Sequence, residues 1–197
     1  MAGRVAVALG AGGARGYAHI GALEVLQERG YEVVALSGTS MGALVAGVTA
    51  AGKLEEYTEW SRSLTQREVL RLLDPTLTGG GALRAERVIG RVAEILDGAR
   101  IEDLAIPYTA VAVDLGARRE VWFQRGPVAT AIRASVAIPG VITPIVVDGR
   151  LLVDGGLMNP VPIEPTEEGD VIPSEITIHF EGKVHKVPYR KGLSILE

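Results

Sequence analysis

The sequence contains no cysteine among its 197 residues. Disulfides, thiolate metal sites and cysteine nucleophiles are therefore excluded, and any chemistry must come from oxygen or nitrogen groups. Positive charge is also scarce, because 20 Lys and Arg residues face 24 Asp and Glu residues and give a formal net charge of -4. A chain of this charge lacks the overall attraction to phosphates that nucleic-acid binding uses, so we expect no nucleic-acid partner.

Long apolar runs are missing as well. Val5 to Leu9 is too short for the core of a signal peptide, and the longest run, Met41 to Ala51, is about half the length that crosses a bilayer. We interpret the longer run as a buried helix, and we expect a cytoplasmic protein that associates at most peripherally with a membrane. With 47% hydrophobic residues, the chain can build one well-buried core but not two ordinary ones.

The first 52 residues indicate two successive strand-turn-helix units. Val5 to Leu9 and Val33 to Leu36 are short apolar runs, and each leads through glycines into helical composition, from Ile20 to Leu26 and from Gly42 to Ala51. Because each strand is nearly all apolar rather than alternating, both of its faces should be covered. This pattern predicts an α/β fold with a parallel sheet flanked by helices.

The rest of the chain continues with helices and then strands. A peripheral helical section is expected from Glu55 to Arg100, and Gly79 to Gly81 break it as either the hinge of a flexible cover or a plain turn. The further elements expected are strands at Tyr108–Val113 and Val121–Phe123, a helix at Pro127–Ser135, and a hairpin of Ile145–Val147 and Leu151–Val153 that turns at Asp148-Gly149.

The C-terminal stretch differs in composition from the rest. Ile176, Ile178 and Phe180 alternate with polar residues, and after a turn at Gly182 a second run follows from Val184 to Val187. We therefore expect one α/β domain over residues 1–170 and an atypical β-hairpin tail over residues 171–197.

The segment Gly38-Thr39-Ser40-Met41-Gly42 fits the Gly-x-Ser-x-Gly nucleophile elbow. It lies between an expected strand and an expected helix, where that motif is strained and presents its serine near a helix N-terminus. Small residues at positions 38 and 42 are needed because strand and helix approach closely there. The alternative is an ordinary serine N-cap.

A glycine-rich loop follows the first expected strand. Its backbone N–H groups, at Gly12, Gly13, Ala14, Arg15 and Gly16, can form an anion-binding nest at the start of a helix. In an acyl hydrolase the anion would be the oxyanion of the tetrahedral intermediate. A dinucleotide fingerprint is the competing interpretation, but it requires glycine where Arg15 stands, and no Gly-Lys-Ser or Gly-Lys-Thr phosphate loop is present.

Asp154 comes directly after the strand Leu151–Val153 and precedes Gly155 and Gly156. A carboxylate at a strand end is well placed for an α/β site, because such sites gather at strand ends. An Asp-Gly turn without catalytic function is the alternative.

Together these motifs resemble the patatin-like phospholipase family, which includes bacterial proteins similar to the hydrolase domain of neuropathy target esterase. The resemblance covers about Val5 to Pro165 and includes the segments Ala134-Ser135 to Ile138-Pro139-Gly140 and Asn159-Pro160-Val161-Pro162. It implies a three-layer α/β hydrolase with a mostly parallel central sheet, which cleaves lipid or other acyl esters as a phospholipase A, lysophospholipase or carboxylesterase. No metal or organic cofactor is implied.

The resemblance also implies a Ser40–Asp154 dyad without histidine, and an oxyanion loop on Gly12, Gly13 and nearby backbone. His19 falls in the first expected helix, and His179 and His185 fall in the tail, so none is well placed as a general base. A triad through His179 remains formally available. Ala11 stands where many relatives have glycine, which affects the loop backbone, and Arg15 is either a loop or lipid contact or a surface arginine.

Three further alternatives stay open. The chain could retain the fold as a noncatalytic binding protein, or bind nucleotide at the first glycine loop. Contact with a membrane could use the arginines of the helical section, which are Arg62, Arg67, Arg71, Arg84, Arg87 and Arg91. Alternatively, these arginines form a solvated helix face balanced by Glu68, Glu86 and Glu94.

After Pro165 the sequence departs from the family pattern. A helix and a further core strand normally follow, whereas this tail weakly resembles the opening hairpin of a 2Fe-2S ferredoxin domain without cluster-binding cysteines. We therefore expect either a fragment or an unusual fusion, whose sheet lacks an edge strand. The sequence does not predict the oligomeric state.

Overall fold

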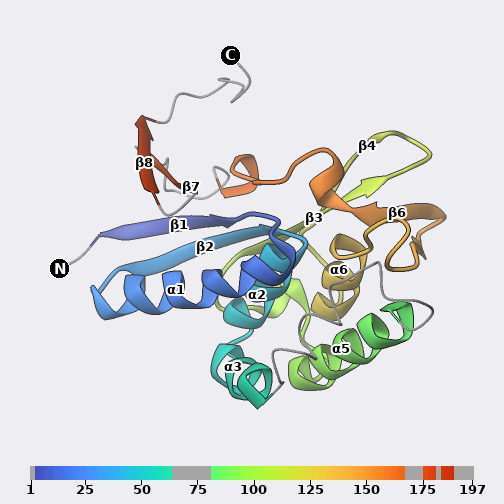
Figure 1. The fold of residues 1–197 in the computed structure, drawn as a ribbon, viewed down its shortest axis with the longest axis horizontal. Helices are drawn as coiled ribbons and strands as arrows, with labels where there is room; N and C mark the ends of the chain where they lie inside the picture. The colour runs from blue at the N-terminus through green and yellow to red at the C-terminus, as the bar shows by residue number, and fades with distance from the viewer. Residues whose placement is uncertain (1–2, 64–80, 167–174, 181–182, 189–197) are drawn as a thin grey trace.

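The computed structural model describes residues 3–63, 81–166, 175–180 and 183–188. Its centre is a six-stranded sheet in the order β1-β2-β3-β6-β5, with β4 also paired to β3. Strands β1, β2 and β3 are parallel, whereas β4, β5 and β6 join through antiparallel pairs (Figure 1). The bounds are β1 Arg4–Leu9, β2 Glu32–Thr39, β3 Tyr108–Asp114, β4 Arg119–Phe123, β5 Ile145–Val147 and β6 Arg150–Asp154.

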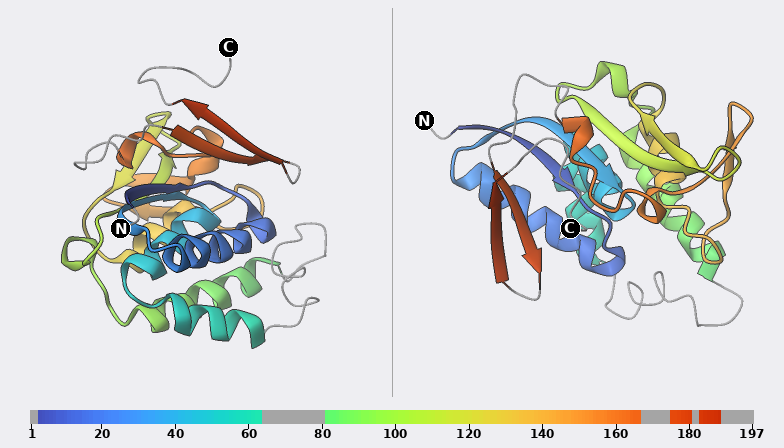
Figure 2. Two further views of the ribbon diagram at one scale, coloured as in Figure 1. Left: turned by 90° about the vertical axis from the view of Figure 1, so that its left-hand side faces the viewer. Right: turned by 90° about the horizontal axis from the view of Figure 1, so that it is seen from above.

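The α-helices of the described residues lie on one side of this sheet in two tiers (Figures 1 and 2). Helices α1 (Ala18–Glu28), α2 (Met41–Ala50) and α6 (Val128–Ser135) pack directly on the strands. Helices α3 (Leu54–Ser63) and α5 (Gly81–Leu96) form the outer tier, because α3 packs on α2 and α5 packs on α6. The predicted α/β class is confirmed, with parallel pairing from β1 through β2 to β3 and with helices packed on the sheet.

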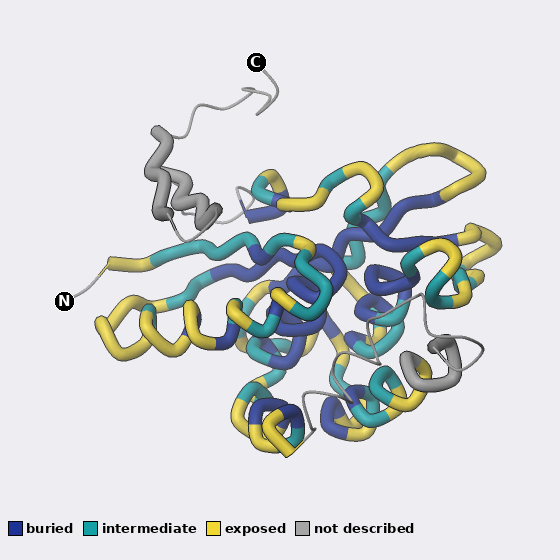
Figure 3. The backbone as a smooth tube through the Cα atoms, viewed as in Figure 1, coloured by how far each residue is buried: buried dark blue, intermediate teal, exposed yellow. Residues whose placement is uncertain are grey.

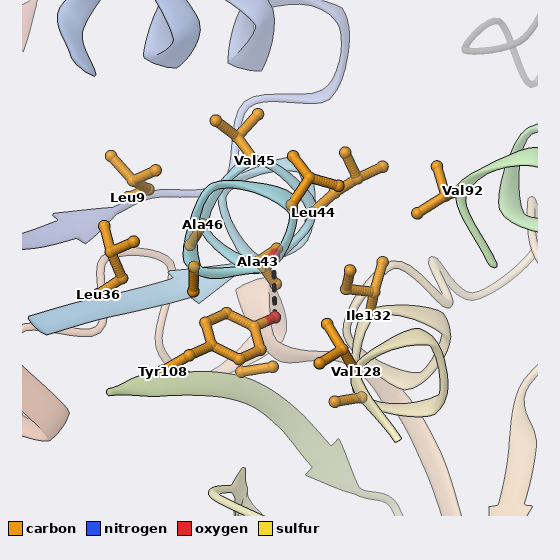
Figure 4. Packing of buried hydrophobic residues seen from close by; sticks show 14 of the residues in the cluster. Leu9, Leu36, Ala43, Leu44, Val45, Ala46, Val92, Tyr108, Val128 and Ile132 are labelled. Carbon is orange, nitrogen blue, oxygen red and sulfur yellow. Dashed lines mark hydrogen bonds between the residues drawn. The ribbon is translucent and has the colours of Figure 1, made fainter. Parts of the chain in front are cut away.

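Helix α2 is the centre of the hydrophobic core. Nine of its ten residues are buried, as the apolar run from Met41 predicted. Strand side chains such as Leu36 pack on one side of it and Ile132 of α6 on another, while the Tyr108 hydroxyl donates a 2.7 Å hydrogen bond to the Ala43 carbonyl (Figure 4). That bond satisfies the buried phenol, so α2 is fixed to β3 by packing and by one polar contact.

The opposite side of the sheet is covered by the chain that follows β6. This segment contains two short 3-10 helices, η3 (Gly155–Leu157) and η4 (Glu164–Thr166). Ser37 and Thr39 are two residues apart on β2, so their side chains lie on the same face. Ser37 donates to the Pro162 carbonyl, and Thr39 donates to the Asn159 carbonyl at 2.8 Å. Strand β3 is buried along its whole length, whereas β1 is only partly buried because, among the described residues, it pairs with β2 alone (Figure 3).

Other sequence predictions have clear outcomes. The β5–β6 hairpin turns at Asp148 and Gly149, whose φ angles of 49° and 74° are the positive values that a type I′ turn needs. The tail forms the predicted antiparallel hairpin of β7 (Glu175–Phe180) and β8 (Lys183–Pro188). Gly79, Gly80 and the Gly182 turn lie outside the described residues. The division into two domains stays a prediction.

Candidate active site

Two strands that are distant in sequence end against the same edge of β3. Val111 pairs with Trp122 of β4 on one side and Thr39 of β2 on the other, whereas Ala112 pairs with Val121 of β4 and Asp154 of β6. Since β4 occupies one edge of β3 from Ala110 to Asp114, β2 and β6 must share the opposite edge. Their carboxyl ends therefore meet, and the residue after Thr39 lies beside Asp154.

Ser40 occupies the tight turn between β2 and α2. Its backbone angles, φ 57° and ψ -123°, lie outside the regions that non-glycine residues normally adopt, and only surrounding structure can hold them. The Ser40 Oγ donates a 2.6 Å hydrogen bond to Asp154 Oδ2 and makes no capping bond to helix α2. The side chain therefore does not act as an N-cap, although Ser40 occupies the N-cap position.

The glycines on either side of Ser40 fit where a side chain would not. A Cβ on Gly38 would overlap the Gly42 backbone, and one on Gly42 would overlap the Leu9 carbonyl. Met41, the other elbow residue beside Ser40, is buried and lies against Gly16 of the glycine-rich loop, where a Cβ would overlap its side chain. Strand, helix and loop thus approach closely around the serine.

Both oxygens of the Asp154 carboxylate are engaged. Oδ2 accepts the Ser40 hydroxyl, and Oδ1 accepts the Gly156 amide at 2.7 Å. Asp154 therefore makes the local contact of an Asp-Gly turn as well as the contact with Ser40. Gly155 is also constrained, because a Cβ there would overlap the Val111 carbonyl of β3.

Burial dominates the electrostatics of Asp154. The residue is 5% exposed, and loss of hydration raises the pKa of its carboxyl above the ordinary value. The hydrogen bonds from Ser40 and Gly156 oppose that rise but do not cancel it. The carboxylate is thus a stronger base than an exposed aspartate and is already in contact with the hydroxyl proton.

The glycine-rich loop contacts the segments on either side of the Ser40–Asp154 hydrogen bond. A Cβ on Gly156 would be 3.4 Å from Ala11 Cβ, and the Ala11 amide donates to the Pro160 carbonyl at 2.8 Å. Gly12 precedes the short 3-10 helix η1 (Gly13–Tyr17), and Gly13 has a positive φ of 50°. Among the hydrogen bonds of the described residues, none uses the Gly12 or Gly13 amide as donor. Ala14 is partly buried and Arg15 is exposed.

No described histidine lies between the serine and the aspartate. His19 Nε2 donates to the Gly10 carbonyl at 2.8 Å, so this ring supports the glycine-rich loop. His179 and His185 lie in strands β7 and β8, and their side chains are outside the described part of the structure. Within the described residues, no group of three His, Cys, Asp or Glu residues is arranged to hold a metal ion.

Sequence reasoning missed the contact that supports the Ser40 backbone. Ser135, at the end of α6, is fully buried; its Oγ accepts the Ser40 amide at 2.8 Å and donates to the Val111 carbonyl at 2.7 Å. One hydroxyl thus joins the strained turn to β3. Ser135 appeared in the sequence analysis only within the segment Ala134-Ser135 to Ile138-Pro139-Gly140 that carries the family resemblance, and that segment did not indicate a partner for its hydroxyl.

Comparison with known proteins gives a consistent assignment. Residues 7–166 match the sequence model of the family described as patatin-like phospholipase. The chain belongs to the patatin-like phospholipase family. An uncharacterized NTE family protein of Mycobacterium tuberculosis is 60% identical over 162 residues, which are 82% of this chain and 45% of that protein.

Animal members of the patatin-like family are also similar. Patatin-like phospholipase domain-containing protein 6 of Homo sapiens is 34% identical over 81% of this chain and 12% of its own length. VipD from Legionella pneumophila shares the fold with a TM-score of 0.51 at 15% identity, over 98% of this chain and 48% of VipD. The chain therefore spans less than half the length of these relatives. Within the described residues, no helix is long and apolar enough to cross a membrane.

The Ser135 contact gives a first prediction for this patatin-like site. Ser135→Ala leaves the buried Ser40 amide and Val111 carbonyl without their partner, so we expect the free energy of unfolding to fall by about 1–3 kcal/mol. The Ser40 turn should also relax, which slows labelling of Ser40 by a fluorophosphonate. Urea unfolding and the labelling rate measure the two effects.

Ser61→Ala is the matched control for Ser135→Ala. Ser61 is also buried, but its hydroxyl donates to the Thr58 carbonyl within α3, away from the turn. It should alter stability without altering the labelling rate. Wild-type labelling of a folded Ser135→Ala protein would show that this hydroxyl does not position Ser40.

Proposed function

We propose that this chain is a serine lipid acyl hydrolase in which Ser40 is the nucleophile and Asp154 is its general base. The observation that supports this most directly is the 2.6 Å hydrogen bond from Ser40 Oγ to a buried carboxylate, within a strained strand-to-helix turn. Nucleophile and base are already within the distance that proton transfer requires. Family membership supports a lipid substrate, and an acyl ester supplies the carbonyl that a serine attacks.

The proposed reaction has two halves. Asp154 accepts the Ser40 proton as Oγ attacks the ester carbonyl carbon, and the proton passes to the leaving alcohol as the carbon–oxygen bond breaks. Asp154 then deprotonates a water that attacks the acyl-serine, and the proton returns to Ser40 as the free acid is released. The raised pKa of Asp154 favours both proton acceptances.

The oxyanion that forms in each half needs donors close to Ser40. We assign this role to the glycine-rich loop, since the Gly12 and Gly13 amides have no acceptor within the described residues and the loop packs on the start of α2. A preorganised donor of this kind lowers the barrier by roughly 3 kcal/mol. Arg15 is exposed at the same loop, where it can contact an anionic headgroup.

The experiment that tests the function is reaction with a fluorophosphonate probe, followed by peptide mapping by mass spectrometry. We expect one adduct, on the peptide that contains Ser40, and none in Ser40→Ala. An adduct on another serine, or none on a protein shown to be folded by circular dichroism, would contradict the proposal and favour a noncatalytic patatin-like protein. Hydrolysis of a short-chain soluble ester provides the matching turnover assay.

A further inference from the structure

Exposed apolar side chains are concentrated around the hairpin that supplies Asp154. Eight large hydrophobic residues of the described chain are exposed, and six of them come from position 115 or from residues 146–161. Isolated exposed hydrophobics need no explanation, but a cluster beside a candidate site indicates an interaction surface. The six are Leu115, Val146, Leu151, Leu157, Met158 and Val161.

Three of these residues form a row across neighbouring strands. Val146 and Leu151 are register partners in β5 and β6, and the Leu115 amide donates to the Leu151 carbonyl at 3.0 Å. Residues opposite one another in adjacent strands project to the same face, so the three side chains lie together. Leu115 is 42% exposed, Val146 69% and Leu151 44%. Leu152, the next residue after Leu151 on β6, points to the other face of the strand and is buried against α6.

Arginines surround this apolar row. Arg118 and Arg119 lie at the tip of the β3–β4 hairpin and Arg150 begins β6; all three are exposed and, among the ion pairs of the described residues, none includes them. Asp148 is the one exposed acid at the two tips, because the Asp114 carboxylate is buried and accepts the Gly116 and Ala117 amides. Counted formally, the three arginines face three carboxylates at the two tips, because Asp114 and the half-buried Glu120 are charged as well as Asp148. The arginines are the more exposed groups, since the Glu120 carboxylate accepts hydrogen bonds from the Trp122 and Asn159 side chains.

The two hairpin tips lie side by side at one end of the molecule in Figure 1 and in the right-hand view of Figure 2. Leu151 precedes Asp154 by three residues on β6, which corresponds to about 10 Å along a strand. We propose that this hairpin face, defined as Leu115, Val146, Leu151, Arg118, Arg119 and Arg150, docks on an anionic phospholipid bilayer. The inference rests on the proposed function, because a lipid acyl hydrolase meets its ester at a bilayer surface. The odd spacing of Leu151 and Asp154 places their side chains on opposite faces of β6.

The hairpin face is a better candidate for the bilayer-binding surface than the arginines of the helical section. Arg62 pairs with Glu24 at 3.9 Å and Arg91 pairs with Glu94 at 2.9 Å, and the side chains of residues 67, 71 and 84 lie outside the described structure. Arg87 is exposed and no ion pair of the described residues includes it, but none of the exposed large hydrophobic residues in the described chain lies in its helix α5. At the hairpin face, unpaired arginines and exposed aliphatic side chains occur together. An interfacial site needs both, because charge attracts the protein to anionic headgroups and apolar area retains it.

The test is vesicle flotation with the full chain and two multiple variants. We expect wild type to bind vesicles of mixed phosphatidylcholine and phosphatidylserine, and to bind less as salt concentration rises. The apolar variant Leu115→Ser/Val146→Ser/Leu151→Ser and the charge variant Arg118→Gln/Arg119→Gln/Arg150→Gln should each bind at least roughly tenfold more weakly. Pure phosphatidylcholine should bind wild type weakly.

Matched control variants come from the opposite end of the molecule. Val25 and Tyr31, 42% and 39% exposed, lie in and just after α1, and Arg29 follows the same helix without an ion pair among the described residues. The controls Val25→Ser/Tyr31→Ser and Arg29→Gln should bind vesicles as wild type does. Circular dichroism and thermal unfolding check that every variant is folded.

Hydrolysis of a short-chain soluble ester separates this inference from the proposed function. If both hold, the folded hairpin-face variants hydrolyse the soluble ester like wild type but lose vesicle binding. Vesicle binding that is unchanged in the variants overturns the docking surface and leaves the hydrolase intact. Absent hydrolysis contradicts the proposed function, while flotation still reports on the surface. Absent vesicle binding together with self-association that the apolar variant abolishes overturns the inference in favour of an interface between two copies.

Discussion

Asp154→Asn is expected to lower turnover of a soluble ester by roughly 10³-fold or more while leaving the fold intact. The substituted amide has nearly the same shape, and its oxygen can accept one hydrogen bond from Ser40 or Gly156, but it cannot accept the serine proton. Fluorophosphonate labelling of Ser40 should slow to a similar extent. Steady-state kinetics, with circular dichroism on the same sample, measure the effect, and normal turnover in the variant would rule out the dyad.

The same substitution has an expected effect on stability. Because burial raises the pKa of Asp154 in the folded protein, the native state holds this proton more tightly than the unfolded chain does. Stability from this group is therefore greatest at acidic pH and falls as pH rises through the folded pKa. The pH range in which Asp154 becomes ionised is thus the range in which its charge destabilises the fold. Thermal unfolding should show that Asp154→Asn lacks this decline.

Gly42→Ala is expected to reduce the free energy of unfolding by about 3 kcal/mol. The new Cβ would overlap the Leu9 carbonyl, which is backbone and cannot rotate away as a side-chain end could. Relief requires α2 to move from β1 and the glycine-rich loop, so Ser40 should lose its alignment and labelling should slow. Urea unfolding and the fluorophosphonate rate report the two effects.

Gly21→Ala is the matched control for Gly42→Ala. Gly21 is also a helical glycine, but a Cβ there would meet nothing within 4 Å. Alanine is favoured over glycine in a helix by about 1 kcal/mol, so this variant should be slightly more stable than wild type and fully reactive. Equal stability of the two variants would contradict the close approach of α2 to β1.

Much of the fold could be predicted because its elements have strong local signals. The apolar run from Met41 predicted a buried helix, Asp148-Gly149 predicted a hairpin turn, and glycines at positions 38 and 42 predicted a close approach of strand and helix. The loop, elbow and aspartate motifs likewise identified the segments that the structure brings together. Each of these signals arises within a few residues, where the backbone chemistry is decided locally.

The remaining features depend on pairing between distant segments, which local patterns do not record. Nothing in the residues around Ser135 indicated that its hydroxyl would accept the Ser40 amide. The partial burial of β1 was also unexpected, because an apolar strand has the same composition in the middle of a sheet as at its edge. Likewise, the row of Leu115, Val146 and Leu151 exists only once three strands are in register.

The shared edge of β3 separates the two roles that we propose for the β5–β6 hairpin. Asp154 is placed by its register against Ala112, whereas the Asp148-Gly149 turn lies at the far end of the hairpin and is not paired to the core. Residues added in pairs at that turn would lengthen the arm without moving the carboxylate. Changes at the tip can therefore alter which surface the hairpin binds. The position of Asp154 relative to Ser40 would stay the same.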